Sequence, residues 1–396
     1  MMNSSSPVSR LLECQNLSNL THLNISFIDP NGMKKLGESP NLTNLKRLMI
    51  NHSHRCAISQ QDFRVFCNSA NFCKLTELQL HCFENQLFNA IEILTESEIF
   101  KSGQLTSLRL HGPVLRYTDV RYLVENSKTT FSNLKTLHCE VHDMKSIQLL
   151  ASCSQFQQLT SLGLSYCQLE DDSVAALIDS NSCLKSLHSL HFAGNCISFK
   201  GVRSLMNFQN LELFDLQQNP IEVEGAKIIS LSEHMKTLTY LDLSSCRIGD
   251  EGLMYLTQSQ YLSKLNTLIL ARNHLGPKGA HYLAETEWRT FPNLTYLDMK
   301  DNWFGDSGLL ALATCEIIKN LKELFLTHLV LGTTSAEYLF SSDNSFGKVS
   351  KFHLKVNKCE NPSQCKHLVQ GLLKKYPHAQ IQTGESYSIK RKCSIM

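Results

Sequence analysis

The segments Leu105-Thr-Ser-Leu108-Arg-Leu110, Leu159-Thr-Ser-Leu162-Gly-Leu164 and Leu238-Thr-Tyr-Leu241-Asp-Leu243 share one pattern, L-x-x-L-x-L. The pattern recurs thirteen times along the chain, with its first apolar residue at positions 20, 45, 75, 105, 134, 159, 187, 211, 238, 265, 294, 321 and 349. Successive copies therefore begin 24 to 30 residues apart. A fixed period of this length is typical of a solenoid, in which each unit buries its apolar face only by stacking on its neighbours.

Each copy predicts a short strand followed by a helix. Alternate strand residues point to opposite faces, so Leu241 and Leu243 should enter the core while Tyr240, Asp242 and Ser244 face solvent. The segments after the strands carry apolar residues at helical spacing, namely Leu253, Leu256 and Thr257; Ala280, Leu283 and Ala284; and Leu309, Leu312 and Ala313. Parallel strands joined by right-handed crossovers then follow, with the sheet inside a curve and the wider helices outside.

A polar residue recurs three positions after the last apolar residue of the strand, as Asn195, Asn219, Asn273, Asn302 and Asn357. There a side-chain amide can satisfy backbone groups left unpaired as the chain leaves the strand. Together with segments such as Asn219–Ala226, Arg247–Leu253 and Asn273–Ala280, this pattern resembles ribonuclease-inhibitor-type leucine-rich repeats. The resemblance covers about residues 20–357 and implies an α/β leucine-rich-repeat solenoid, a curved horseshoe with a parallel inner sheet and outer helices. Such a solenoid offers a long exposed concave sheet for binding.

The repeat also sets the expected organisation of the chain. Residues 1–19 are expected to form an N-terminal cap, 20–357 the solenoid, 358–383 a C-terminal cap, and 384–396 a flexible tail. In the C-terminal cap, Ser363 is the expected start of a helix that Pro377 ends, followed by a last strand within 378–383.

Composition narrows the class of protein. With 42% hydrophobic and 19% charged residues the chain can build a continuous core, and its net charge of +2 gives no reason to expect nucleic-acid binding. The 15 cysteines include no C-x-x-C motif, and several, such as Cys139, Cys167 and Cys246, occupy repeat positions that suit small apolar groups. Because the N-terminus also lacks the features of a signal peptide, we expect reduced thiols in a cytoplasmic protein.

Catalytic signatures such as a P-loop, G-x-S-x-G and H-E-x-x-H do not occur in the sequence. His81, His111 and Glu140 fall on adjacent expected strands and could in principle hold zinc, but 16 histidines make such a coincidence ordinary. We therefore expect a non-enzymatic protein with no cofactor and no metal.

The segment Lys390-Arg-Lys-Cys393-Ser-Ile-Met396 fits the C-a-a-X prenylation signal, in which a terminal methionine favours a farnesyl group. Prenylation of Cys393 would place the protein at the cytosolic face of a membrane. One lipid chain binds reversibly, and Lys390, Arg391 and Lys392 would add attraction to anionic lipids.

The solvent face of the strands supplies the candidate site for a protein partner. Acidic and aromatic side chains cluster there, and such a strip suits a basic protein surface, although a solvated strand face is polar in any case. The candidate partner-binding residues are Asp215, Tyr240, Asp242, Arg272, Tyr296, Asp298 and Asp301.

Two other functions stay open. The repeats are similar to those of Ran GTPase-activating proteins, which implies a regulator of a small GTPase, but those proteins carry an acidic tail where this chain has a basic one. A ubiquitin-ligase substrate adaptor is the second alternative, although no F-box precedes the first repeat.

Overall fold

A computed structural model describes residues 7–12, 14, 17–26, 28, 31–51, 58–81, 89–125, 131–179, 182–287, 289–331, 345–359, 370–377 and 379–383. Ser363 and the tail residues Lys390, Arg391, Lys392 and Cys393 lie outside the described residues, as does the side chain of Asn357. The chain forms two compact units, Met1–Phe192 and Ala193–Met396. The repeat pattern did not predict a boundary at this point.

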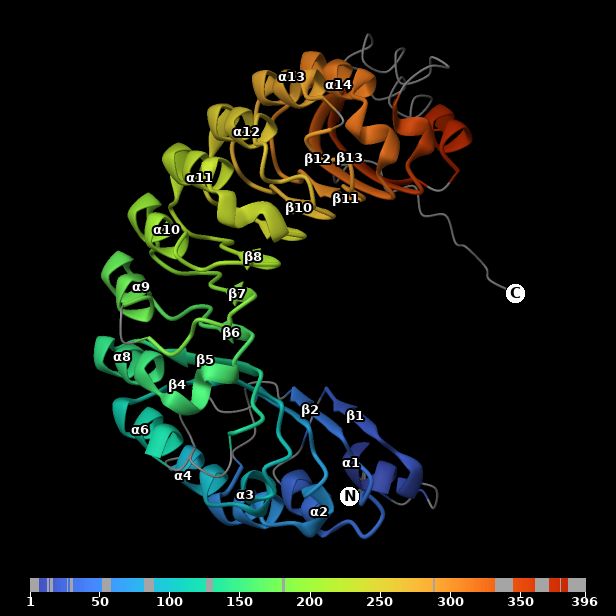
Figure 1. The fold of residues 1–396 in the computed structure, drawn as a ribbon. Coiled ribbons are helices and arrows are strands. Elements are labelled where there is room, and N and C mark those ends of the chain that lie inside the picture. Colours follow the sequence, from blue (N-terminus) through green and yellow to red (C-terminus); the bar gives the residue numbers. More distant parts are fainter. Residues whose placement is uncertain are drawn as a thin grey trace. The chain divides into compact units, whose positions relative to one another are not determined.

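In both units short parallel strands alternate with helices (Figure 1). The first unit contains α1 (Pro7–Leu12), β1 (His22–Ile25), α2 (Gly32–Glu38), β2 (Arg47–Asn51), α3 (Gln60–Cys67), β3 (Glu77–His81), α4 (Ala90–Thr95), α5 (Glu98–Lys101), β4 (Ser107–Leu115), α6 (Tyr117–Glu125), β5 (Thr136–Val141), α8 (Met144–Ser152), β6 (Ser161–Gly163), α9 (Asp171–Leu177) and β7 (Ser189–His191). Short 3-10 turns at Leu17–Asn19, Ala70–Phe72 and Ser154–Gln158 lead into strands. Strands β1 to β7 lie side by side in chain order.

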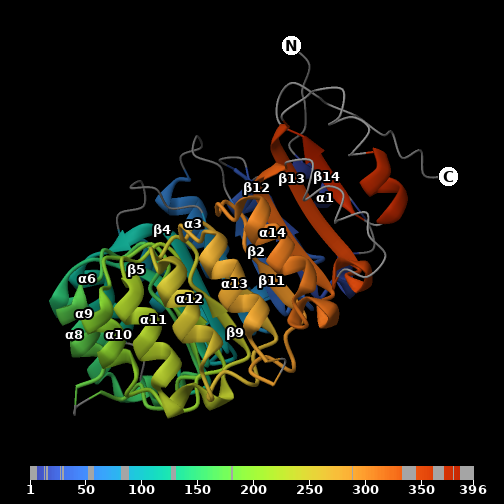
Figure 2. The ribbon, with the colours of Figure 1, turned by 90° about the horizontal axis from the view of Figure 1, so that it is seen from above.

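The second unit continues the same alternation. It contains α10 (Phe199–Leu205), β8 (Leu213–Asp215), α11 (Glu222–Leu231), β9 (Tyr240–Asp242), α12 (Gly249–Thr257), β10 (Thr267–Ile269), α13 (Pro277–Glu285), β11 (Tyr296–Asp298), α14 (Gly305–Thr314), β12 (Glu323–Leu331), β13 (Lys351–Cys359) and β14 (Gln380–Thr383), with 3-10 turns at Glu233–Thr237, Ile317–Asn320 and Ser345–Lys348. Strands β8 to β14 follow one another in chain order, and helices α11 to α14 lie in a row over one face of the sheet (Figure 2).

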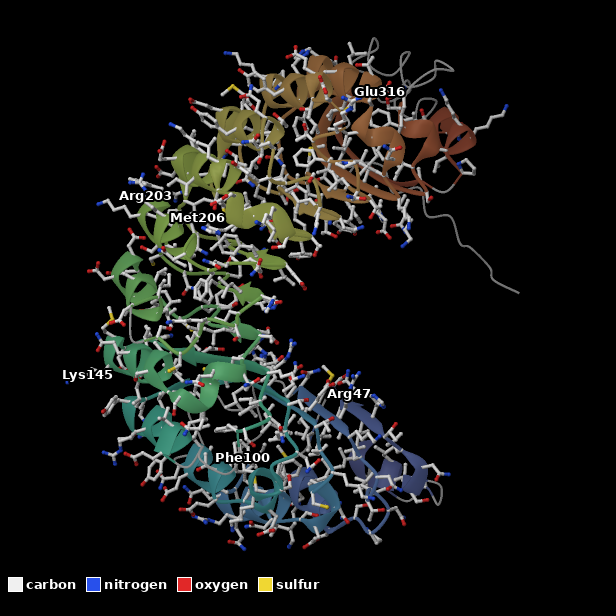
Figure 3. The ribbon with its side chains drawn as sticks, viewed as in Figure 1. Arg47, Phe100, Lys145, Arg203, Met206 and Glu316 are labelled. Carbon is white, nitrogen blue, oxygen red and sulfur yellow. The ribbon has the colours of Figure 1, made fainter. Side chains whose placement is uncertain are left out.

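The predicted assignment of leucines to the core is confirmed. Leu241, Leu243, Leu268 and Leu270 are fully buried between the strands and the helices. The helix residues Leu253, Leu256, Leu283, Leu309 and Leu312 are buried against them, as the helical spacing predicted. Figure 3 shows the same division in the first unit and in α10: Lys145 and Arg203 project outward from their helices, whereas Phe100 is 1% exposed. No helix of the described residues lies on the opposite face of the strands, which we call the open face.

The recurring asparagines connect neighbouring repeats, which confirms their predicted role. Asn302 accepts hydrogen bonds from the backbone N–H groups of Asn273 and Leu275, at 2.9 and 3.0 Å, and its amide donates to the carbonyl of Leu270 at 2.9 Å. Asn273 in turn accepts from the N–H of Cys246 at 3.0 Å and donates to the carbonyl of Leu243. Both side chains are completely buried, so they satisfy backbone groups that water cannot reach.

Two cysteines take the asparagine position in their own repeats. The Cys246 thiol donates to the carbonyl of Leu216 at 3.1 Å, and the Cys167 thiol donates to the carbonyl of Cys139 at 3.5 Å. The interpretation of these residues as small apolar groups was therefore incomplete, because each thiol is also a weak donor that replaces an amide. Burial raises the pKa of the Cys246 thiol to about 12, so this group is unreactive at neutral pH.

We expect Asn302→Ala to lower the free energy of unfolding by about 3 kcal/mol, because it removes the side-chain partner of two buried N–H groups and of the buried carbonyls of Leu270 and Met299. Asn293→Ala is the matched control, since Asn293 is exposed and its amide makes one bond, to the carbonyl of Ser263. Urea unfolding followed by circular dichroism measures both. Equal losses for the two variants would show that the buried amide is not what connects the repeats.

No helix in the described part of the chain is long and apolar enough to cross a membrane.

Candidate functional site

The open face of the second unit brings together the seven predicted partner-binding residues, but it buries two of them. Asp242 is 7% exposed and Asp298 is 6% exposed, so the prediction that they are accessible was wrong, as it was for the buried Ser244. Each carboxylate turns back onto its own strand end: Asp242 accepts from the N–H of Ser244 at 2.8 Å, and Asp298 accepts from the N–H of Lys300 at 2.9 Å. The alternation of side chains along a strand predicts which face a residue occupies. It does not predict that the carboxylate turns back toward its own backbone.

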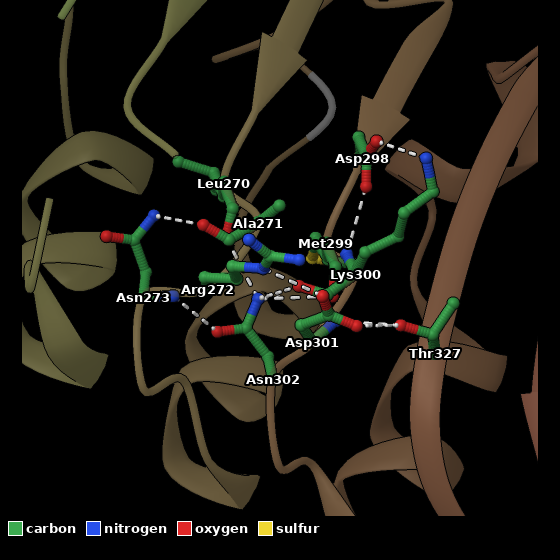
Figure 4. A network of polar contacts seen from close by, with 10 residues as sticks. All are labelled: Leu270, Ala271, Arg272, Asn273, Asp298, Met299, Lys300, Asp301, Asn302 and Thr327. Atoms are coloured by element: carbon green, nitrogen blue, oxygen red, sulfur yellow. Dashed lines mark hydrogen bonds and ion pairs between the residues drawn. The ribbon is translucent and has the colours of Figure 1, made fainter. Parts of the chain in front are cut away.

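Two of the four aspartates have a cationic partner within the fold. Lys300 reaches back to Asp298, with 2.9 Å between Nζ and Oδ2. Asp301 accepts from Arg272 Nε at 2.9 Å, and it also receives the hydroxyl hydrogen of Thr327 at 2.7 Å (Figure 4). These ion pairs make this end of the predicted acidic strip close to neutral.

The other two aspartates, Asp215 and Asp242, form no ion pair with any residue that the structure describes. They are register partners on the neighbouring strands β8 and β9. Asp215 accepts only from the N–H of Gln217, at 3.0 Å. Burial, together with the adjacent Asp242, raises the pKa of Asp215 to about 6, and burial likewise raises the pKa of Asp242. The open face therefore holds two adjacent carboxylates without compensating charge.

Aromatic rings lie beside these carboxylates on the same face. Tyr240 and Tyr296 are half-buried on β9 and β11, two residues before Asp242 and Asp298 on the same strands. Burial raises the pKa of both phenols, with the nearby aspartates adding to the effect. Each therefore keeps its proton and presents a hydroxyl donor on an apolar ring.

The aromatic surface continues over the next two strands, beyond the predicted residues. The ring centroid of Phe325 lies 5.2 Å from that of Tyr296 and 4.0 Å from that of His353, against which it stacks. Lys300 Nζ lies 4.1 Å from the centroid of Phe325, a cation–π contact. Sequence reasoning missed His353 and Lys300 as members of this surface, although the parallel register places His353 directly beside Phe325.

In the first unit, the histidines considered as zinc ligands do not form a metal site. The carboxylate of Glu140 accepts from the N–H of Gly112 at 3.0 Å, at an irregularity in the pairing of β4 with β5. The rings of His81 and His111 contact each other edge to face, with centroids 5.6 Å apart. Within the described ranges, no group of three or more histidine, cysteine or carboxylate residues is arranged to hold a metal ion.

Comparisons with known proteins agree with this repeat architecture. Residues 183–206, 234–256, 261–284 and 292–313 match a family model described as Leucine Rich repeat. The human leucine-rich repeat-containing protein 42 is 36% identical over 87 residues, a stretch that covers 20% of this chain and 20% of that protein. The chain thus matches about a fifth of the length of this curated relative.

Among solved structures, a chain of the yeast complex of Rad7 and Elc1 is similar over 91% of this chain and 85% of its own, with a TM-score of 0.51 and 18% identity. The chain carries leucine-rich repeats. An internalin from Listeria monocytogenes has a TM-score of 0.48 and 18% identity over 92% of this chain and 98% of its own. The repeat match and the parallel sheet confirm the predicted α/β leucine-rich-repeat solenoid, a scaffold suited to protein interaction. The ribonuclease-inhibitor subclass and the likeness to Ran GTPase-activating proteins stay predictions.

Proposed function

We propose that the protein is a non-enzymatic interaction scaffold whose second unit binds a basic segment of a protein partner on its open face. The observation that carries this proposal is the pair Asp215 and Asp242, two adjacent carboxylates that no cation compensates in the described part of the chain. Tyr240 and Tyr296, on β9 and β11, lie beside them and carry hydroxyl donors on apolar rings. A lysine or arginine of the partner would supply the missing charge, and its aliphatic stem would pack on the rings.

The energetics of the carboxylate pair support a binding role. A pKa of about 6 for Asp215 means that its ionised form is disfavoured in the fold relative to an unfolded chain. The group therefore lowers stability at neutral pH rather than raising it. Sites that bind ligands commonly retain such destabilising groups, because the ligand supplies the compensating contact.

The similarity to solved structures supports the scaffold and leaves the partner open. A chain of the yeast complex of Rad7 and Elc1 has a fold similar to that of this chain. Regulation of a small GTPase is the alternative activity. A GTP hydrolysis assay with a panel of small GTPases would separate it from a purely binding role, because an interaction scaffold leaves the hydrolysis rates unchanged.

The decisive experiment is affinity capture of the wild-type protein from its native cells, followed by measurement of Kd for the captured partner. We expect Tyr240→Ala combined with Tyr296→Ala to weaken binding at least tenfold, because aromatic residues at the centre of interfaces are frequent hot spots. Tyr255→Ala, on helix α12 of the same unit, is the matched control and should leave the Kd within about twofold. Unchanged binding by the double variant would show that the partner does not bind on this face.

Replacing the carboxylate of Asp215 tests the same proposal in a second way, because stability and partner affinity should change in opposite directions. Asp215→Asn keeps an acceptor for the N–H of Gln217 and removes the charge, so we expect the free energy of unfolding at pH 7 to rise by about 1–3 kcal/mol while partner affinity falls. Glu251→Gln on α12 is the charge control, since Glu251 is exposed. Loss of stability in Asp215→Asn, or gain of affinity, would contradict a carboxylate held for binding.

We also propose that Cys393 is prenylated and that Lys390, Arg391 and Lys392 strengthen membrane association; this proposal rests on the sequence Cys393-Ser-Ile-Met396. Cys393→Ser should shift the protein from the membrane to the soluble fraction. Neutralising the three basic residues should reduce association partially and make it less sensitive to salt. Intact mass spectrometry of protein from native cells checks the modification. A mass without a lipid, or a chain that continues past Met396, would refute it.

A further inference from the structure

Four histidine rings lie in succession on the open face of the first unit. His81, His111, His138 and His191 come from β3, β4, β5 and β7. Their ring centroids are separated by 5.6 Å, 6.4 Å and 4.7 Å in that order. The row is continuous although β6 lies between the last two strands.

A glycine on β6 makes this continuity possible. Gly163 is the register partner of both His138 and His191, and a Cβ atom placed on it would lie 2.4 Å from Cγ of His138. Only glycine therefore allows the His138 ring to lie across β6 and reach His191. There the His138 Nε2 contacts the hydroxyl of Ser161 at 3.3 Å. The rings thus form a fixed surface.

One arginine stands within this row. Arg109 is the register partner of His138 and lies half-buried on β4, two residues before His111. Among the residues that the structure describes, no carboxylate or carbonyl pairs with its guanidinium. The nearby carboxylate of Glu140 is already bonded to the N–H of Gly112. The five donors of an arginine are rarely left without acceptors at a half-buried position, so the guanidinium is available to an anion.

The electrostatics of the row favour an anion. Burial, followed by the charge of Arg109, lowers the pKa of His138 to about 2 and that of His191 to about 4. Burial, together with His81 and Arg109, also lowers the pKa of His111, although Glu140 opposes the shift. At neutral pH these rings are therefore uncharged N–H donors around one permanent cation. A bound carboxylate would offset the charge of Arg109 and ease protonation of the rings.

We propose that this surface binds an acidic segment of a protein partner, with Arg109 as the bidentate contact to a carboxylate side chain and the half-buried His111 and His191 as neutral donors beside it. The bidentate geometry of guanidinium and carboxylate supplies the specificity. A peptide, rather than a small anion, fits the extended row of rings, which runs from β3 to β7. The site differs from the acidic face of the second unit in charge and in occupant, and it does not rest on that proposal.

Fluorescence anisotropy with labelled hexaglutamate tests the site on the full-length protein at low salt. We expect saturable binding that Arg109→Gln weakens at least tenfold. Arg121→Gln, which removes an arginine from helix α6 of the same unit, should leave the Kd within about twofold. A variant with Lys390, Arg391 and Lys392 replaced by glutamine excludes attraction by these basic residues and should bind as the wild type does. Labelled hexalysine should not bind at this site.

The pH profile separates direct contact from a structural effect. The facing groups are His81, Arg109, His111, His138, Glu140 and His191. The pKa values of about 2 and 4 keep His138 and His191 uncharged between pH 7.5 and pH 6. Hexaglutamate should therefore bind through the permanent charge of Arg109 with a Kd that changes by less than about twofold over this interval. Equal binding by Arg109→Gln would overturn the site. Displacement of hexaglutamate by inorganic phosphate at equal charge concentration would show that the site binds small anions and not an acidic segment.

Discussion

Replacing Leu243 by alanine should lower the free energy of unfolding by about 3 kcal/mol, one of the largest effects expected of a single substitution in this chain. Leu243 is completely buried, and its position closes the strand motif of its repeat. The backbone on both sides of it is fixed: the N–H of Leu243 donates to the carbonyl of Ile269, and its carbonyl accepts from the amide of Asn273. A cavity at this point cannot collapse without breaking contacts between repeats.

Leu231→Ala is the matched control, because the same atoms are removed from a side chain that is 64% exposed at the end of α11. Its effect should stay within about 0.5 kcal/mol. Chemical denaturation of both variants measures the difference. A loss for Leu243→Ala as small as that for Leu231→Ala would mean that the repeats do not share one packed core at this position.

The solenoid could be predicted from the sequence because its determinants are local and periodic. Leu241 and Leu243 enter the core because alternation within a strand fixes their face, and Leu253 and Leu256 follow from the period of a helix. Asn273 and Asn302 were predictable for the same reason: a buried turn that recurs in every repeat needs the same donor and acceptor each time. The parallel sheet then follows from the stacking of equivalent strands.

The details of the candidate sites depend on side-chain rotation and on neighbours in the next repeat, which periodicity does not specify. Asp242 and Asp298 occupy the predicted face, yet both turn toward their own backbone and become buried. The sequence also gave no indication that Lys300 neutralises Asp298, because a lysine two residues away can point elsewhere. The reach of His138 across β6 depends on the absent side chain of Gly163, a contact that only the register reveals.

These local features divide the open faces by charge within each unit. In the second unit, fold-internal cations satisfy Asp298 and Asp301 but not Asp215, so the acidic character is confined to β8 and β9. In the first unit, Arg109 lies beside a row of imidazoles, of which His138 and His191 are uncharged at neutral pH because burial lowers their pKa to about 2 and about 4. Asp215 in the second unit and Arg109 in the first form no ion pair with a described residue. Uncompensated charges of this kind are expected on surfaces that bind partners of opposite charge.

The stability of the first unit should fall steeply in acid because His138 is buried as an uncharged ring. Its pKa in the fold is about 2, against 6.5 for the unperturbed side chain, so the unfolded chain binds the proton more tightly. The stabilisation is fully present above pH 6.5 and is lost as the pH falls toward 2. Between pH 6.5 and 4 this single group should lower the free energy of unfolding by about 3 kcal/mol, at 1.36 kcal/mol per pH unit.

His138→Phe keeps a ring over Gly163 and removes the titration, so the stability that this variant loses over the same interval should be smaller by about that amount. His281→Gln, at an exposed position on α13, controls for loss of a histidine and should follow the parent curve. Urea unfolding at half-unit pH steps measures all three proteins, and parallel curves for His138→Phe and the parent would show that His138 is not the group that titrates.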